Sequence, residues 1–244
     1  MARYKRKKKR LIKSSVALLG VILLTYVVVY YQDDISSYVD SIKDEPVVSY
    51  ELDAIPEYNG ESYVVINDNK TNFSEEDMAF TGEKYSDLDS LGRCGVAMAR
   101  VGKETMPTEE RESIGMIKPS GWHTVKYDIV SGKYLYNRCH LIGYQLTGEN
   151  ANPKNLITCT RSMNTEGMLD FENSVADYVE ETGNHVLYRV TPIFEGDNML
   201  ASGVQIEAKS VEDEGVGLEF NVFVYNVQEG ITIDYSTGDS KLTE

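Results

Sequence analysis

The chain has 244 residues and a formal net charge of −15, and this charge is unevenly distributed. Eight of the 24 lysines and arginines lie within the first 13 residues. The remainder therefore carries 16 basic against 39 acidic residues, a net charge of −23. So acidic an exterior argues against a protein that grips nucleic acid over a broad basic surface.

The N-terminal 31 residues predict a membrane anchor. A basic segment, 1–13, precedes an apolar stretch, 14–31, whose residues 16–31 are interrupted by one threonine. This length approaches the roughly 20 residues of a spanning helix, and the basic side marks the cytoplasmic end. We expect a single-pass anchor with the body of the chain outside the cell membrane. A cleaved signal peptide, which would release a secreted protein, is the alternative.

Residues 32–60 are polar and acidic and predict a linker. Residues 61–244 then form one domain of roughly 185 residues, enough for a real core. Ser74 before three acids predicts a helix N-terminus. Residues 62–66 and 95–101 are strand candidates, and three more candidates, rich in Val, Ile, Tyr and Phe, occupy residues 185–194, 201–208 and 218–227.

Two further patterns lie between these strands. Residues 124–130 and 133–136 alternate apolar and polar side chains around Ser131-Gly132, which predicts a hairpin. Residues 155–160 predict a short strand or an extended loop. Apolar residues at 168, 171, 175, 178 and 179 predict a helix over 167–181, with Gly183 as its C-cap. This order of elements predicts an α+β fold with a central antiparallel sheet.

One window reverses the acidic trend. Residues 116–161 hold six basic side chains against two acids, and also two of the three histidines. The basic residues are Lys118, Lys126, Lys133, Arg138, Lys154 and Arg161. The window is typical of a site for a polyanion, although a chance fluctuation of charge explains it equally well. Within it we predict Arg138, Lys126 and Arg161 as substrate contacts.

The three cysteines, Cys94, Cys139 and Cys159, cannot all pair with one another. Their spacing matches no zinc pattern. One disulfide with one free thiol, or no disulfide at all, both agree with the sequence.

Hydrolysis of a phosphodiester needs a base for the attacking water and positive charge near the phosphoryl oxygens. His140 has the ordinary pKa of such a base at neutral pH. Arg138 precedes it by two residues on an extended segment, so both side chains point to one side and the guanidinium can hold a phosphate. Cys139 points to the other side, which argues against a Cys–His nucleophile pair.

Asn164 and Glu172 are eight residues apart. On a regular α-helix they are separated by about 80° of rotation and about 12 Å of rise, and so lie on adjoining faces. An amide oxygen and a carboxylate suit a hard divalent cation that keeps several waters. The alternative is a helix cap at Asn164 and a carboxylate that complements the helix dipole.

Three segments together resemble the sugar-nonspecific DNA/RNA endonucleases of the ββα-metal (His-Me finger) class. They are YNRCHLIGYQ (136–145), ENANPKNLIT (149–158) and MNTEGMLDFEN (163–173). The likeness is strongest to secreted and surface-anchored nucleases of Gram-positive bacteria, including DNA-entry nucleases. It covers most of residues 85–235, including SLGRCGVAMA at 90–99.

The resemblance implies a role for each motif residue. It makes His140 the general base, Asn164 the ligand of one divalent cation, and Glu172 the partner of a metal-bound water. Arg138 becomes a phosphate or transition-state contact, and Asn137 supports the histidine or the water shell of the metal. The implied ion is Mg²⁺, with Mn²⁺ as the alternative.

The resemblance also bears on neighbouring positions. Asn155 matches a family asparagine near the site and is predicted to bind substrate. Cys139 stands where the family pattern has glycine, and Asn137 stands in place of aspartate. The predicted ββα-metal motif is the hairpin 124–139 followed by the helix 167–181.

The expected function is a metal-dependent endonuclease that cuts DNA, and RNA as a second substrate, outside the membrane and without strong sequence preference. A surface protein that binds DNA for uptake with weak catalysis is one alternative. A phosphodiesterase acting on another anionic polymer is the other, and substrate assays separate the three.

Overall fold

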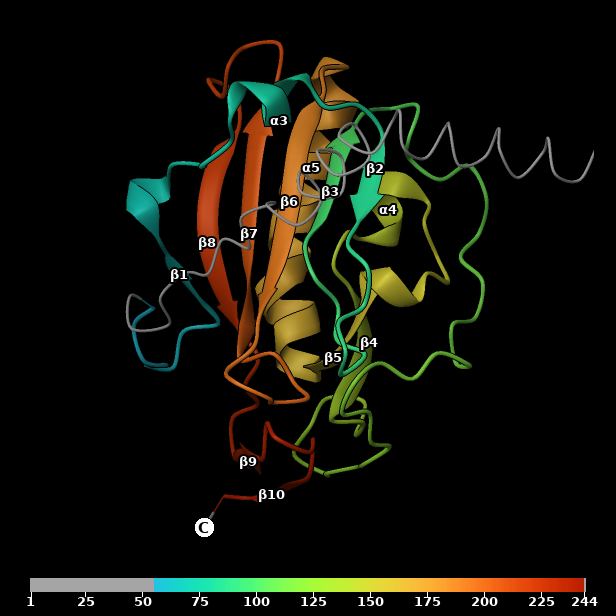
Figure 1. Cartoon of the computed structure of the whole chain (residues 1–244), viewed down its shortest axis with the longest axis vertical. Coiled ribbons are helices and arrows are strands. Elements are labelled where there is room, and N and C mark those ends of the chain that lie inside the picture. The colour runs from blue at the N-terminus through green and yellow to red at the C-terminus, as the bar shows by residue number, and fades with distance from the viewer. Residues whose placement is uncertain (1–54, 244) are drawn as a thin grey trace, which may run out of the picture. The chain divides into compact units, whose positions relative to one another are not determined.

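The computed structural model describes residues 55–243 (Figure 1). A six-stranded antiparallel sheet in the order β1-β8-β7-β6-β3-β2 forms the centre of the fold. Its strands are β1 (Tyr63–Val65), β2 (Glu83–Tyr85), β3 (Ala97–Val101), β6 (Val186–Ile193), β7 (Gly203–Ser210) and β8 (Glu219–Tyr225). The predicted α+β class with a central antiparallel sheet is confirmed.

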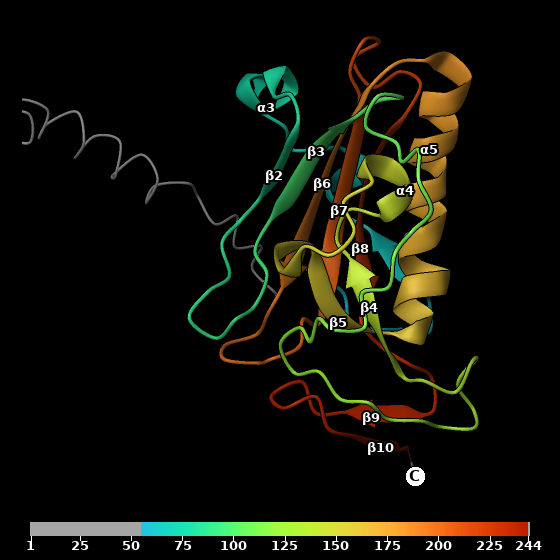
Figure 2. The same cartoon turned by 90° about the vertical axis from the view of Figure 1, so that its right-hand side faces the viewer.

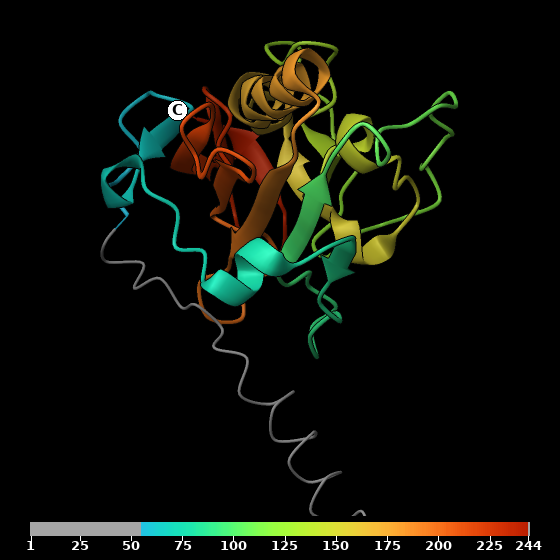
Figure 3. The ribbon, with the colours of Figure 1, turned by 90° about the horizontal axis from the view of Figure 1, so that it is seen from above.

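Two small antiparallel sheets accompany the main one. The first pairs β4 (Tyr136–His140) with β5 (Leu156–Thr160), and the second pairs β9 (Ile231–Ile233) with β10 (Ser240–Leu242). The helical segments are η2 (Asn67–Asn69), α3 (Glu75–Ala79), α4 (Tyr144–Thr147), η3 (Pro153–Asn155), η4 (Met163–Met168) and α5 (Leu169–Thr182). Figures 2 and 3 show α5 along one face of the main sheet and α3 on the other side.

The main core lies between α5 and the sheet. The predicted apolar stripe faces it: Met168, Val175 and Val179 are buried, and the residues at 171 and 178 pack against the same cluster. Because strand side chains alternate, every second residue of β6 meets this layer. The C-terminus of α5 is as predicted, since Gly183 ends the helix in the left-handed conformation.

The predicted hairpin at 124–136 is wrong in extent. It reduces to a single bridge between Lys126 and Tyr134. Gly132 and Lys133 both have positive φ, and consecutive turns use the backbone groups of Tyr127, Val130 and Lys133 locally. The alternating pattern instead reflects a small satellite core, which this segment shares with residues near β9.

The folded part begins before the predicted boundary at residue 61. Ile55 packs against a cluster with Phe223 and Tyr225. The Tyr225 hydroxyl donates to the Pro56 carbonyl at 2.6 Å, and Tyr58 meets the Tyr225 ring edge-on at 5.5 Å. Ile55, Pro56 and Tyr58, in the segment predicted as the end of the linker, therefore lie against β8.

The predicted anchor at 14–31 and most of the linker lie outside the described residues. Within residues 55–243, no helix is both long enough and apolar enough to cross a membrane.

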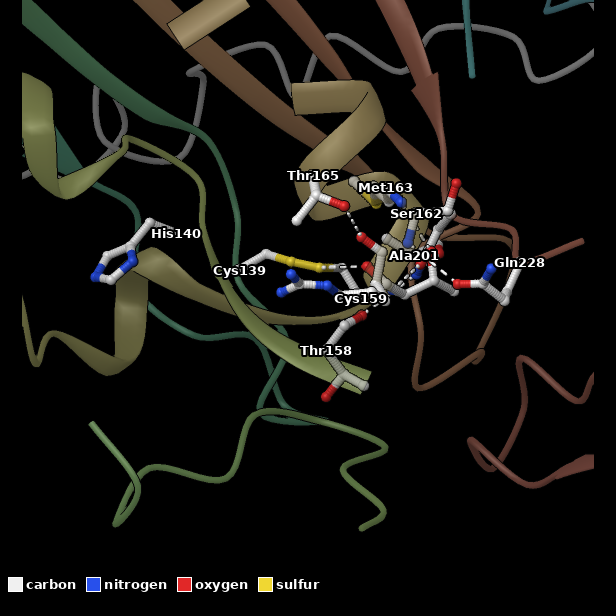
Figure 4. Close-up of a disulfide and its surroundings, with 12 residues drawn as sticks. Cys139, His140, Thr158, Cys159, Ser162, Met163, Thr165, Ala201 and Gln228 are labelled. Atoms are coloured by element: carbon white, nitrogen blue, oxygen red, sulfur yellow. Dashed lines mark hydrogen bonds between the residues drawn. A yellow bond between two sulfur atoms is a disulfide. The ribbon is translucent and has the colours of Figure 1, made fainter. Parts of the chain in front are cut away.

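The structure answers the question of cysteine pairing. Cys139 of β4 and Cys159 of β5 form a disulfide with their Cα atoms 5.9 Å apart, and both are fully buried. Cys94 is a buried free thiol. Figure 4 shows the disulfide between the two strands, with His140 next along β4 and its ring pointing away.

We expect replacement of both cysteines by alanine, Cys139→Ala with Cys159→Ala, to lower the free energy of unfolding. The disulfide closes a segment of 20 residues, which in the chain-entropy model stabilises the folded state by about 3 kcal/mol. Urea denaturation with and without a reducing agent measures this. The wild type should lose stability on reduction, and Cys94→Ser should show the same loss because it keeps the disulfide. The double variant, which has no disulfide to reduce, should show no such loss. Equal stability of oxidised and reduced wild type would contradict the prediction.

Candidate active site

The ββα unit of this fold is β4, β5 and the helix that follows them. β4 and β5 pair in antiparallel register, with His140 opposite Leu156. Helical residues then continue without a break from 161 to 182, through the π-helical turn η4 into α5. The predicted motif location, hairpin 124–139, is therefore corrected: its second strand pairs with the residues predicted only as a short strand or loop.

His140 ends β4 and is 6% exposed. Its Nε2 lies 2.8 Å from the Asn150 carbonyl oxygen, and its Nδ1 lies 3.2 Å from Nη2 of Arg111. A carbonyl only accepts, so Nε2 carries the proton and Nδ1 of the neutral ring holds the lone pair. The local structure thus fixes one tautomer and aims the basic nitrogen at Arg111.

The pKa of His140 is lowered to about 4, mainly by burial; the bond to Asn150 opposes this shift, and the Arg111 charge adds to it. The imidazole is consequently neutral at pH 7. A neutral ring with a directed lone pair is the form that a general base requires.

Glu172 lies in the first turn of α5 and is half-buried. Burial raises the pKa of its carboxyl to about 8, and the Arg111 charge opposes this shift. Its carboxylate also lies against Gly143, just beyond His140 in the chain. Arg111 therefore lies beside His140 and its charge also acts on Glu172, so that the three side chains belong to one region of the fold.

Asn164 lies within the π-helical turn, half-buried, and its side chain makes no hydrogen bond within the described part of the chain. A π turn closes i to i+5, so each residue rotates less than in an α-helix. The rotation about the helix axis that separates Asn164 from Glu172 is therefore smaller than the roughly 80° of a regular α-helix, and the two residues lie closer to one face. Gly167 allows the wide turn to pack closely, since a Cβ there would lie 2.4 Å from Val224 Cγ1.

Arg138 is occupied by the loop that precedes β4. Its Nη2 donates to the Gly115 carbonyl at 2.9 Å, its Nε donates to the Ile117 carbonyl, and its guanidinium covers the Trp122 ring at 3.9 Å. The side chain therefore anchors this loop beside the site, and its contact with phosphate stays a prediction. Trp122 is half-buried and packs in the satellite core.

Asn155 has a different place from the one predicted. It is fully buried, and its amide makes two bonds to the backbone of Ile142: Nδ2 donates at 3.0 Å and Oδ1 accepts at 2.9 Å. Both amide atoms are used within the protein. Direct substrate binding by Asn155 is therefore wrong, and the residue clamps the turn that follows His140.

The remaining predicted residues surround this centre. Asn137 lies opposite Cys159 in the β4–β5 pair, and its Nδ2 is buried with no partner among residues 55–243. Arg161 begins the helical run and likewise has a buried Nε with no partner in that range. Lys126 lies on the peripheral turn, 4.4 Å above the Tyr134 ring. Their proposed roles stay predictions.

Arg111 is the site residue that sequence reasoning missed. It lies between acidic neighbours in the segment EERE (109–112), just outside the basic window at 116–161. No periodicity or motif marks it. Its position depends on a long loop that returns to the end of β4, where the Asn150 Nδ2 donates to the Glu112 carbonyl at 3.1 Å.

The donor set suits a hard cation with few protein ligands. The described residues contain no group of three or more His, Cys, Asp or Glu side chains placed to enclose a metal. What they offer is the Asn164 amide oxygen and the Glu172 carboxyl group, which has no hydrogen-bonded cationic partner in that range to stabilise its ionised form. Magnesium accepts such sparse oxygen ligation because it retains most of its waters.

Comparison with known proteins identifies the family. A family model described as DNA/RNA non-specific endonuclease matches residues 72–212, more than half of the chain. The magnesium-bound crystal structure of NucA from Streptococcus agalactiae is 26% identical with a TM-score of 0.68, covering 78% of this chain and 92% of that one. The zinc-bound Sda1 nuclease is 25% identical with a TM-score of 0.61, covering 75% and 97%. The chain belongs to the DNA/RNA non-specific endonuclease family and is a hydrolytic nuclease.

Proposed function

We propose that this nuclease cuts DNA, and RNA as a second substrate, at internal phosphodiester bonds with one bound divalent cation, Mg²⁺ or Mn²⁺. The observation that carries the proposal is the neutral, buried His140, whose Nδ1 lone pair is directed toward Arg111, the cation whose charge also acts on Glu172. NucA holds magnesium and Sda1 holds zinc in their solved structures, which supports a divalent ion here.

Each residue of the site has a separate role in hydrolysis. Nδ1 of His140 accepts the proton of the attacking water, and the Nε2 bond to Asn150 holds the ring in place as positive charge develops. Before this transfer the bond from Arg111 Nη2 to Nδ1 breaks, because it occupies the lone pair; the freed guanidinium then turns to the phosphoryl oxygens. Asn164 would bind the cation and Glu172 would hold it or its waters; the cation supplies positive charge to the scissile phosphate.

We place the catalytic domain outside the cell membrane. The basic segment before the apolar stretch 14–31 favours a cytoplasmic N-terminus. The Cys139–Cys159 disulfide supports an oxidising location, because thiols of cytoplasmic proteins are kept reduced. Protease treatment of intact cells tests the proposal: digestion of the domain without lysis is expected, and full protection would contradict it.

The test of activity is digestion of closed circular plasmid and of single-stranded RNA by the purified chain, with Mg²⁺, Mn²⁺ or EDTA. We expect nicking and linearisation that require metal and show no fixed cut position. Binding of DNA with no cleavage in either metal would favour the uptake protein instead. Cleavage of another anionic polymer, with nucleic acid left intact, would favour the second alternative.

Arg111→Ala is expected to lower the rate of DNA cleavage by about 10²- to 10³-fold, the effect of losing one charge-stabilising donor in the transition state. Arg111→Lys should restore only part of the rate, because an ammonium lacks the planar pair of donors. Steady-state rates on a defined oligonucleotide measure the loss. Lys103→Ala, which removes a positive charge near Gly183 at the far end of α5, is the matched control and should cleave normally. Equal losses in both variants would indicate a general charge effect.

A further inference from the structure

Gly143 faces the Glu172 carboxylate at very short range. A Cβ built on this glycine would lie 2.5 Å from Oε2, 2.6 Å from Cδ and 2.8 Å from Oε1 of Glu172. The entire carboxylate therefore occupies the space that any other residue at position 143 would fill with its side chain.

The backbone conformation does not explain the glycine. Gly143 has φ −57° and ψ 142°, which every residue type adopts freely. It is also the N-cap of α4, where Ser, Asp, Asn and Thr are favoured because they bond to the free N–H groups. The helix begins with no side-chain cap. Space for the Glu172 carboxylate is the feature of this position that requires glycine.

Hydrogen bonds on both sides of Gly143 hold the backbone of its turn in place. The preceding residue, Ile142, has its N–H and its carbonyl both bonded to the buried Asn155 amide, at 2.9 and 3.0 Å. The Gly143 carbonyl accepts from the Leu146 N–H at 2.9 Å, within α4. A methyl group at position 143 would therefore push on the carboxylate, which ends a flexible side chain.

We propose that Gly143 is a positioning residue for Glu172: because it has no side chain, the Glu172 carboxylate fills the space beside it and is held toward the metal site. The proposal rests on the proposed function of Glu172. Asn155 contributes indirectly, because its two hydrogen bonds fix the backbone of Ile142, the residue before Gly143. The HLIG segment (140–143) thus carries both the base, His140, and the glycine that leaves room for the Glu172 carboxylate.

The test is Gly143→Ala, compared with Gly217→Ala in the full chain. Gly217 is the matched control because a Cβ there would also meet a carboxylate and a ring. It would lie 2.7 Å from Asp213 Oδ2 and 2.5 Å from Tyr178 Cε2, neither of which is a site residue. We expect G143A to cleave DNA about 10- to 100-fold more slowly and to need more Mg²⁺ for half-maximal rate, as when a metal's supporting shell is disturbed. G217A should keep both values.

A double-mutant cycle shows whether the loss acts through Glu172. In an E172Q background, G143A should change the residual rate little, because the carboxylate it displaces is already gone. An equal further loss in that background would overturn the proposal, as would a crystal structure of G143A with the carboxylate in its original place. Wild-type chain that cleaves nothing would instead overturn the proposed function, and the inference with it.

A companion variant covers the case in which G143A folds poorly. G143A combined with E172D withdraws the carboxylate by one methylene and relieves the crowding. Its melting temperature should rise above that of G143A if the conflict lies at this carboxylate. No recovery would place the conflict elsewhere and overturn the proposal.

Discussion

His140→Ala is expected to lower the rate of DNA cleavage by about 10²- to 10⁴-fold, the contribution of a positioned general base. Nδ1 of the ring carries a lone pair directed toward Arg111, and burial lowers the pKa of the ring to about 4, so the ring is unprotonated at neutral pH.

The fold should survive this change. The variant leaves the Asn150 carbonyl without its partner, at a cost of about 1–3 kcal/mol. The Cys139–Cys159 disulfide and the Asn155 clamp still hold the surrounding strands and turn. Circular dichroism and a melting curve should therefore show a folded protein with a modestly lower melting temperature.

Two controls separate chemistry from structure. His140→Asn can donate to the Asn150 carbonyl but lacks a base, so it should be more stable than the alanine variant and equally slow. His123→Ala removes an exposed histidine bonded to the Thr237 carbonyl, and should cleave at the wild-type rate. If His140→Ala kept more than one-tenth of the wild-type rate, the base would have to be another group.

Local patterns predicted the parts of the fold whose burial is regular. The strands β6, β7 and β8 are rich in β-branched and aromatic residues, and the stripe of α5 repeats at helical spacing, so each could be found within its own segment. Three-residue strands such as β2 (Glu83–Tyr85) have too few side chains for a pattern, and they form because a neighbour supplies the edge.

The site was harder to predict because its geometry depends on long-range contacts. Cys139 and Cys159 are diagonal neighbours on β4 and β5, since Cys139 lies opposite Ile157 and Cys159 opposite Asn137, and this proximity depends on the pairing of the two strands. Arg111 reaches His140 through a loop that no local signal fixes. Asn155 shows a different difficulty: a buried structural asparagine and a ligand-binding one have the same sequence signature. The motif residues His140, Asn164 and Glu172 were found through the family pattern, whereas the π turn between the last two was not visible in a stripe that also fits a regular helix.

Glu172→Gln is expected to move activity and stability in opposite directions. Cleavage should fall by about 10- to 100-fold or more, because an amide holds a metal or its waters less well than a carboxylate. The metal-free variant should nevertheless unfold at a higher temperature than the wild type at pH 8 and above.

The reason for the stability gain is the raised pKa. The unfolded chain releases the Glu172 proton near pH 4.5, whereas the folded chain keeps it up to about pH 8 because burial disfavours the charge. The folded state binds more protons between these values, so its stability is fully present below pH 4.5 and is lost as pH rises through 8. For this half-buried group the loss is on the order of 2–4 kcal/mol, and glutamine, which stays neutral, avoids it.

Melting curves from pH 5 to 9 in EDTA measure the difference between the two proteins. His140, whose folded pKa is lowered, contributes the opposite slope below pH 6.5, but it does so in both proteins and cancels in the comparison. The gap should widen toward pH 8 and shrink when Mg²⁺ is added, because the cation favours the ionised carboxylate of the wild type alone. Glu166→Gln, an exposed acid on the π turn bonded to Ser162, should show neither effect. A pH-independent gap would mean that Glu172 is ionised in the folded protein and that its charge is already balanced without metal.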